Sequence, residues 1–437
     1  MPRPFQLAVV PWSNFSKAGC PPEPSKHENG SDRHQKPCLA NEGAFEIWLR
    51  GLEYTTVDLR RVSASQIVPS NVALLWDDDF LESNSTVHST NHVRSVEINP
   101  TDACNHACGW CFTSKHRNTQ ILPTWKLRHY LDNFTSHGGR SIHFSGGGEP
   151  LLYKPLVEAS ADFDGLSVLE YGLNCGLAVG VITNGVYLTK LEAHLGVRVT
   201  ELAFVRVSLD ATTSEEYKRA HESRAGDFAS VVESIRSLLL LRGPAVTPAI
   251  GISFIVDAVH GINATPKALM QIAKLSTSMG VDFVQIKHVH TADAVCAQRL
   301  MERIHSWCMS FNELWGSTEF WVHQYDTPKP QLVCRMPRMS QVLGASGERY
   351  PCCHRFGDST FYSGAPFESV GKTATECLAP VCRHQSVNYA VDQALGNSRA
   401  RIELREGLRT SLERDGFHPY RLFPSAPRLF LPYGVSA

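Results

Sequence analysis

Long apolar runs are missing from this sequence. No stretch approaches the roughly 20 consecutive apolar residues that a membrane-spanning helix requires. The opening MPRPFQLAVVPW contains only a short apolar run interrupted by Pro11, which argues against a secretory signal. An excess of charge of one sign is missing too, since the formal net charge is -1 at pH 7. We therefore predict a cytoplasmic protein that binds neither membranes nor nucleic acid.

A regular cysteine framework of the kind found in small secreted domains is also absent. The 13 cysteines are spread over 437 residues without such spacing, which argues for metal chemistry in a reducing compartment. Hydrophobic residues make up 43% of the chain and charged residues 19%, as in an ordinary globular protein. A chain of this length can hold a barrel of about 200–250 residues together with smaller appendages.

The first part of the chain gives little sign of an independent domain. Residues 1–43 are rich in Pro, Ser, His, Asn and Lys, a composition that predicts a flexible segment. Residues 44–93 contain short apolar stretches that end in polar turns, which fits a small cap or an extension of a sheet. They do not read clearly as a winged-helix module that grips a leader peptide.

Residues 94–316 alternate strand-like and helix-like patterns, which is typical of parallel βα units. Strands are predicted at residues 95–100, 141–145, 179–183, 204–210, 249–256 and 282–287. Among the helices, one is predicted to begin at Pro266 after the N-cap Thr265 and to end before Gly280. The pattern predicts an α/β fold in which polar residues at the carboxyl ends of the strands gather at one site.

Three cysteines follow the first predicted strand with CxxxCxxC spacing, in the stretch TDACNHACGWCF. They are Cys104, Cys108 and Cys111. Thiolates are the ligands of iron–sulfur clusters, and a cubane of four irons has four positions to fill. Three ligands leave one iron open to another molecule, as in catalytic metal sites. A zinc knuckle, or three unrelated buried thiols, is the alternative for this spacing alone.

Small and polar residues end the next three predicted strands. They are Gly147, Gly148 and Glu149 after the second strand, Asn184 after the third, and Ser208 and Asp210 at the end of the fourth. Glycines let a ligand approach the backbone, and a carboxylate beside them can accept hydrogen bonds from an ammonium group. Each residue taken alone also fits an ordinary turn.

The cysteine loop, with Trp110 before its last cysteine, resembles that of the radical S-adenosylmethionine superfamily, and GGEP after the second strand adds to the resemblance. The resemblance implies a partial (β/α)6 TIM-type barrel and a [4Fe-4S] cluster whose open iron binds S-adenosyl-L-methionine. It assigns Gly147, Gly148 and Glu149 to the methionine amino group. It also assigns ribose or carboxylate contacts to Asn184, Ser208 and Asp210, and an adenine contact or a packing role to Trp110. Relatives often hold the cofactor carboxylate with an arginine, a role open here to Arg219, His221 or Arg224.

A second group of cysteines lies in residues 317–387. Cys334, Cys352, Cys377 and Cys382 resemble the ligands of a twitch domain, the shorter relative of SPASM, which implies an auxiliary [4Fe-4S] cluster. Cys353 is a rival ligand or a catalytic thiol that returns hydrogen to a substrate radical. A structural zinc site with the same four thiolates remains the alternative. Residues 388–437 read as a helix followed by a Pro-rich tail.

The resemblance implies an enzyme that cleaves S-adenosylmethionine reductively to a 5′-deoxyadenosyl radical, with electrons from a flavodoxin- or ferredoxin-type donor. The expected substrate is a polar small molecule, namely a sugar, aminocyclitol, nucleoside or amino-acid unit. Lys287, His288 and His290 at the end of the sixth strand are candidates to contact it. Oxidation, epimerisation or elimination would follow, in natural-product biosynthesis. The alternatives are a maturase acting on a ribosomal peptide and, from another class, a zinc-binding scaffold without catalysis.

Overall fold

The computed structural model describes residues 93–116, 119–245, 247–257, 262–289, 294–311, 318–322, 337, 340–357, 399 and 402. The predicted segment 1–43, and all of segment 44–93 except its last residue, lie outside these ranges. So does the predicted tail 388–437 apart from two residues. None of the described helices is both long enough and apolar enough to cross a membrane.

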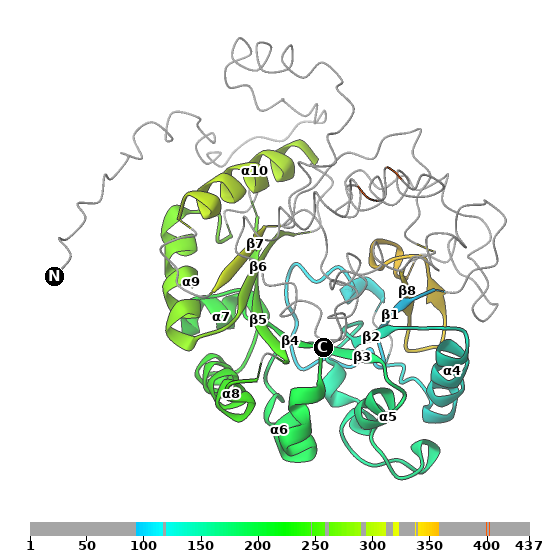
Figure 1. Cartoon of the computed structure of the whole chain (residues 1–437). Helices are drawn as coiled ribbons and strands as arrows, with labels where there is room; N and C mark the ends of the chain where they lie inside the picture. The colour runs from blue at the N-terminus through cyan, green and yellow to red at the C-terminus, as the bar shows by residue number, and fades with distance from the viewer. Residues whose placement is uncertain are drawn as a thin grey trace. The chain divides into compact units, whose positions relative to one another are not determined.

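The described residues form one nine-stranded sheet with the order β7-β6-β5-β4-β3-β2-β1-β8-β9 (Figure 1). Neighbouring strands from β7 through to β8 are parallel, and β8 and β9 form the one antiparallel pair among them. The strands are β1 (Ser95–Ile98), β2 (Ser141–Phe144), β3 (Ala178–Thr183), β4 (Phe204–Ser208), β5 (Ala249–Val256), β6 (Phe283–His288), β7 (Glu319–Val322), β8 (Ser340–Leu343) and β9 (Arg349–Tyr350).

All six predicted strands are present, with bounds within two residues of those expected. The sheet extends further on both sides, because β7 pairs with β6 and β8 pairs with β1. Beyond the end of β1, Asn99 N donates a hydrogen bond to Leu343 O over 2.8 Å. The hairpin of β8 and β9 lies within residues 317–387, where a twitch-like domain is predicted, and it continues the barrel sheet. Strand β1, which leads into the cysteine loop, therefore lies inside the sheet between β2 and β8.

Helices connect the parallel strands and lie along the outer side of the curved sheet (Figure 1). They are α4 (Thr124–Ser136), α5 (Val168–Asn174), α6 (Thr189–Leu195), α7 (Ser214–His221), α8 (Asp227–Arg242), α9 (Pro266–Met279) and α10 (Ala294–Phe311). Short 3-10 turns lie at Ser114–His116, Pro150–Leu152, Lys154–Leu156, Ala161–Phe163, Gly196–Glu201 and Cys353–Arg355. The predicted caps of α9 are confirmed, since Thr265 Oγ1 accepts a hydrogen bond from Ala268 N and Gly280 adopts a φ of +79°.

The two faces of the sheet differ in polarity because successive side chains on a strand point to opposite sides. Buried aliphatic residues face the helices; a Cβ added to Gly172 of α5 would meet Ile142 and Val179 at 3.1 and 3.2 Å. The face opposite to this helix-covered one carries polar side chains at alternate positions, among them Glu97, His143, Arg206, Ser208, Gln285 and Lys287. The helix-covered face therefore forms the core, and the opposite face is suited to a polar ligand.

The buried face of α4 offers a test of this core. Leu131 is fully buried, and its replacement by alanine should lower the free energy of unfolding by about 2–5 kcal/mol, through lost apolar contact and a remaining cavity. Leu240 on α8 is 82% exposed, so Leu240→Ala should change the stability by less than about 0.5 kcal/mol. Chemical denaturation measures both. Equal losses for the two variants would contradict the packing of α4.

Candidate functional site

The cysteine loop leaves β1 and is fastened to the glycine-rich turn that follows β2. Gly148 N donates a hydrogen bond to Thr101 O over 2.8 Å, and Glu149 N donates to Ala103 O over the same distance. The turn approaches so closely that a Cβ on Gly148 would lie 2.0 Å from Ala103 O. Only glycine fits at this position, because no real Cβ approaches an oxygen that closely.

Each of the last two loop cysteines has a polar neighbour. Cys108 Sγ lies 3.1 Å from His221 Nδ1, and Cys111 Sγ lies 3.1 Å from Thr113 Oγ1. The Thr113 hydroxyl donates a hydrogen bond to Gly147 O over 3.0 Å, which couples the end of the loop to the glycine-rich turn. Burial raises the pKa of Cys108 to about 12, and the charges of Asp210 and the two neighbouring cysteines add to the effect.

The donor set of this loop suits an iron–sulfur cluster with an open position. Cys104, Cys108 and Cys111 lie on one loop and are all partly exposed, and the charges of the other two cysteines raise the pKa of Cys108. Soft thiolates are the preferred cluster ligands, and the tight turn at Gly148 keeps side-chain atoms away from the loop backbone. The residues present therefore fit a [4Fe-4S] cluster held by three cysteines.

Glu149 joins the ends of β2 and β3 rather than facing solvent. The carboxylate accepts hydrogen bonds from Leu151 N (3.0 Å), Thr183 Oγ1 (2.6 Å) and Asn184 N (2.7 Å), and the residue is only 2% exposed. Burial raises the pKa of Glu149, while these three hydrogen bonds partly offset the rise. The structure thus shows an anchoring role for this carboxylate, and its predicted contact to a methionine amino group stays a prediction.

Asn184, at the end of β3, reaches across to the cysteine loop. Its Nδ2 donates a hydrogen bond to Asn105 Oδ1 over 2.8 Å, and its Oδ1 accepts one from Val186 N over 3.1 Å. The hydroxyl of Tyr217, on α7, donates to the Asn184 carbonyl over 3.2 Å. The cysteine loop, the end of β3 and helix α7 are therefore held together around Asn184.

Asp210 and Ser208 lie at the end of β4, beside β5. Asp210 Oδ1 accepts hydrogen bonds from Ile255 N (2.9 Å) and Ser253 Oγ (3.4 Å), and Ser208 stands opposite Ser253 in the strand register. Burial raises the pKa of Asp210, whereas the positive charges of His221 and Lys287 act to lower it. Asp210 is 3% exposed, whereas Ser208 is partly exposed.

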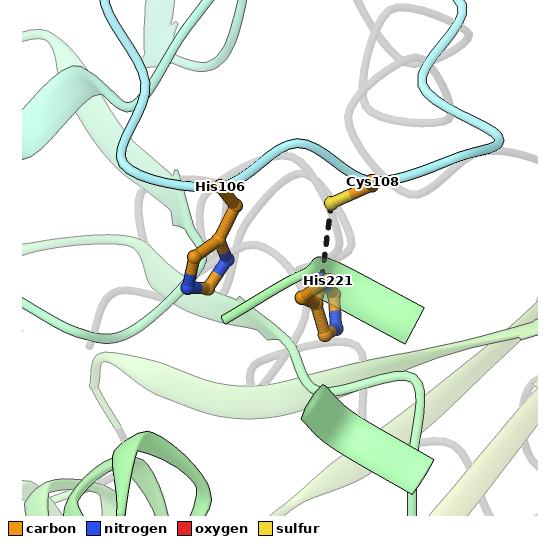
Figure 2. A group of neighbouring side chains, drawn as sticks. All are labelled: His106, Cys108 and His221. Carbon is orange, nitrogen blue, oxygen red and sulfur yellow. Dashed lines mark hydrogen bonds between the residues drawn. The ribbon is translucent and has the colours of Figure 1, made fainter. Parts of the chain in front are cut away.

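His221 is the last residue of α7 and lies directly beneath the cysteine loop (Figure 2). Its Nε2 donates to Leu209 O over 3.2 Å and lies 3.8 Å from Asp210 Oδ2, while its own carbonyl accepts from Ala107 N over 3.1 Å. Burial lowers the pKa of His221, which favours the neutral ring, and Asp210 acts in the opposite direction. Three residues were candidates for the contact to the cofactor carboxylate. Of these, His221 lies against the cysteine loop, whereas Arg219 and Arg224 are exposed.

Trp110 is half-buried, and its ring meets the His221 ring edge-on with the centroids 6.0 Å apart. The structure thus brings together the cysteine loop, Trp110, Gly147, Gly148, Glu149, Asn184 and Asp210. Sequence reasoning missed Thr113, Asn105 and His106 at this site. The only signal for them was their position within or just after the cysteine loop.

The predicted auxiliary site is described only in part. Cys334, Cys377 and Cys382 lie outside the described residues. Cys352 and Cys353 follow β9; Cys352 is partly exposed, whereas Cys353 is 7% exposed and packs with Val342 and Tyr350. An auxiliary cluster, and a reactive thiol at Cys353, stay predictions.

Comparison with protein families agrees with this site. Residues 98–255 match the family model described as "Radical SAM superfamily". The match begins at the last residue of β1 and spans the cysteine loop, the glycine-rich turn, Asn184 and Asp210. The chain therefore contains a radical SAM domain, as the cysteine loop and the glycine-rich turn predicted.

Two curated relatives are similar over part of the chain. One is the "S-adenosylmethionine-dependent nucleotide dehydratase" of Selenomonas ruminantium, 34% identical over 92 residues, which is 21% of this chain and 29% of the relative. The other is the "Probable GTP 3′,8-cyclase" of Methanocaldococcus jannaschii, 28% identical over 149 residues, which is 34% of this chain and 46% of the relative. The chain thus matches less than half the length of either relative.

Among solved structures, Streptococcus suis SuiB bound to S-adenosylmethionine is similar with a TM-score of 0.46 and 12% identity, over 66% of each chain. A TM-score below 0.5 is too low to support a statement about function.

The raised pKa of Cys108 predicts low reactivity in the cluster-free chain. Only thiolates react with iodoacetamide, and a pKa of about 12 instead of 9.0 makes the thiolate fraction at pH 8 on the order of a thousandfold smaller. The alkylation rate of Cys108, followed by mass spectrometry of its peptide, should be low at pH 8 and rise with pH up to about 12. Fast alkylation that levels off near pH 9 would contradict the burial of this thiol.

Proposed function

We propose that this chain is a radical S-adenosylmethionine enzyme that acts on a polar small molecule. The observation that carries the proposal is the cysteine loop after β1, fixed by backbone hydrogen bonds to the glycine-rich turn after β2. Cys104, Cys108 and Cys111 would hold a [4Fe-4S] cluster. Bound there, the cluster would supply the electron that cleaves S-adenosyl-L-methionine to a 5′-deoxyadenosyl radical, received from a flavodoxin- or ferredoxin-type donor. A cytoplasmic location stays a prediction.

The surrounding residues would position the cofactor. The turn at Gly147 and Gly148 would lie beside the methionine amino group, and Glu149 fixes that turn against the end of β3 through hydrogen bonds from Thr183 and Asn184. Asn184, Ser208 and Asp210 lie at the adjoining strand ends and would contact the ribose or the carboxylate, and Trp110 would stack on the adenine.

The polar face of the sheet favours a polar substrate. Arg206 on β4 donates a hydrogen bond from Nη1 to Oε1 of Gln285 on β6, across the intervening strand β5. Lys287 lies two residues further along β6, on the same face of the sheet. Cationic side chains on this face suit an anionic group, since guanidinium and ammonium groups bind phosphate and carboxylate. Among the predicted substrate classes, a nucleoside is favoured, and an anionic group on it would make the substrate a nucleotide. The names of both relatives point to nucleotides, and one to loss of water.

The test is anaerobic reconstitution with iron and sulfide, followed by measurement of 5′-deoxyadenosine formed from S-adenosylmethionine and a reductant. We expect nucleoside triphosphates to raise the yield at least about tenfold over sugars, amino acids and short peptides. Stimulation by peptides alone would favour the maturase alternative. A colourless protein that contains zinc and forms no 5′-deoxyadenosine would favour the scaffold alternative.

The same preparation tests the auxiliary site. About eight irons per chain would support a second cluster at Cys334, Cys352, Cys377 and Cys382, whereas about four would remove it from the proposal. Four irons accompanied by one tightly held zinc would support the structural zinc alternative at those cysteines.

A further inference from the structure

Two buried histidines flank Cys108 on the inner side of the cysteine loop (Figure 2). The ligand atoms of His106, Cys108 and His221 all lie within 4.8 Å of one another, and both histidines are at most 4% exposed. Within the described ranges no other set of three histidine, cysteine or acidic residues is this close. Ligands of a tetrahedral zinc ion lie roughly 3.5 Å apart, so small side-chain rotations would close the set around a metal.

The outer nitrogen of each histidine faces an oxygen acceptor. His221 Nε2 donates to Leu209 O over 3.2 Å, with Asp210 Oδ2 at 3.8 Å, so the neutral ring directs the lone pair of Nδ1 toward Cys108 Sγ. His106 Nε2 lies 3.8 Å from Asp227 Oδ2, which leaves Nδ1 as the nitrogen that we assign to a metal. Metal-ligating histidines have the arrangement seen at His221, in which an outer carbonyl or carboxylate fixes the ring and its tautomer. At His106 the Asp227 carboxylate lies at ion-pair distance from the outer nitrogen.

We propose that His106, Cys108 and His221 form a mononuclear site for a thiophilic divalent cation of the Zn²⁺ type, filled when the cysteine loop holds no cluster. One thiolate and two imidazoles are a donor set for zinc, and a water molecule would complete four-coordination. Binding replaces the Cys108 S–H bond by a sulfur–metal bond, and the proton passes to solvent.

This site and the iron–sulfur cluster compete for one ligand. Cys108 is the middle cysteine of the loop, so zinc held on both histidines withdraws it from the set that the cluster needs. Zinc would therefore inhibit assembly of the cluster. The inference does not depend on the proposed reaction, because it concerns the chain before any cluster is present.

Cobalt titration of the cluster-free full-length chain tests the site, since Co²⁺ bound to thiolate absorbs strongly in the near ultraviolet. Cys108→Ala should bind one Co²⁺ fewer than the wild type, and the difference spectrum should have the intensity of a single thiolate–cobalt bond. His221→Gln and His106→Gln should weaken binding at this site at least about tenfold. Cys104→Ala is the matched control in the same loop and should bind Co²⁺ as the wild type does.

Two outcomes of the titration would overturn the proposal. Loss of the cobalt signal in Cys104→Ala as well would indicate a site made of the loop thiolates, and unchanged binding in both histidine variants would exclude the imidazoles. Since buried histidine variants can fail to fold, ¹¹³Cd NMR of the wild type gives an independent answer. A resonance typical of one sulfur and two nitrogen ligands is expected, and finding only resonances of sites with several sulfurs would refute the site.

The competition has its own test, whose failure is distinct from failure of the proposed function. One equivalent of Zn²⁺ beyond the amount taken up by Cys108→Ala should slow cluster formation in the wild type at least about tenfold, and should have little effect in His106→Gln. Equal cluster formation with and without zinc would refute the competition. Absence of a cluster even without zinc would instead count against the proposed function.

Discussion

Replacing Cys104, Cys108 or Cys111 with alanine is expected to abolish formation of 5′-deoxyadenosine. With two thiolates left, the loop cannot hold a cubane and keep one iron for the cofactor. Loss of an outer hydrogen-bond partner of a metal ligand already costs about 10–100-fold, so loss of a ligand itself should exceed 100-fold. Chromatographic measurement of 5′-deoxyadenosine after anaerobic reconstitution, together with the iron content of each variant, checks the result.

Cys175→Ala is the matched control for these variants. Cys175 follows helix α5, is partly exposed and lies outside the cysteine loop, so its replacement should leave both the iron content and the activity near the wild-type values. Activity that survives in any of the three loop variants, at more than a few per cent of the wild type, would refute the assignment of that cysteine.

The parallel sheet and the cysteine site could be predicted because each has a short-range signal in the sequence. Apolar strands such as Ala249–Val256 alternate with amphipathic helices, and Thr265 and Gly280 mark the ends of α9. Parallel strands with right-handed connections place their carboxyl ends on one edge, so the order of the strands brings Gly148 and Asp210 to the cysteine loop.

The contacts that hold the site together are long-range and had no such signal. Cys108 and His221 are 113 positions apart, and neither their spacing nor their residue types predicted a contact. The pairing of β8 with β1 was missed for a similar reason, since a short strand with a nearby turn reads as a local hairpin whatever sheet it joins. The hydrogen bonds that Glu149 accepts from Thr183 and Asn184 had no signal in the sequence either, and the cofactor contact that the resemblance implies for Glu149 stays a prediction.

Gly148→Ala should weaken binding of S-adenosylmethionine more than any other single methyl group added to this site. The new Cβ would lie 2.0 Å from Ala103 O and 2.7 Å from the Asp102 carbonyl carbon, so the glycine-rich turn must move away from the cysteine loop. Both contacts are with backbone atoms, which cannot rotate aside. Overpacking of this kind costs about 1–3 kcal/mol, and a cost of that size within the site predicts affinity about 10–100-fold lower.

Gly109→Ala is the control that separates this clash from a general effect of alanine in the region. Gly109 lies between Cys108 and Trp110 in the same loop, and a Cβ added there meets no heavy atom within 4 Å. Equilibrium dialysis of the reconstituted variants against S-adenosylmethionine should therefore give wild-type affinity for Gly109→Ala and a large loss for Gly148→Ala. If both variants bind as the wild type does, the turn does not contact the cofactor. If both lose affinity equally, the loop tolerates no added methyl group, and the close approach at Gly148 is not the cause.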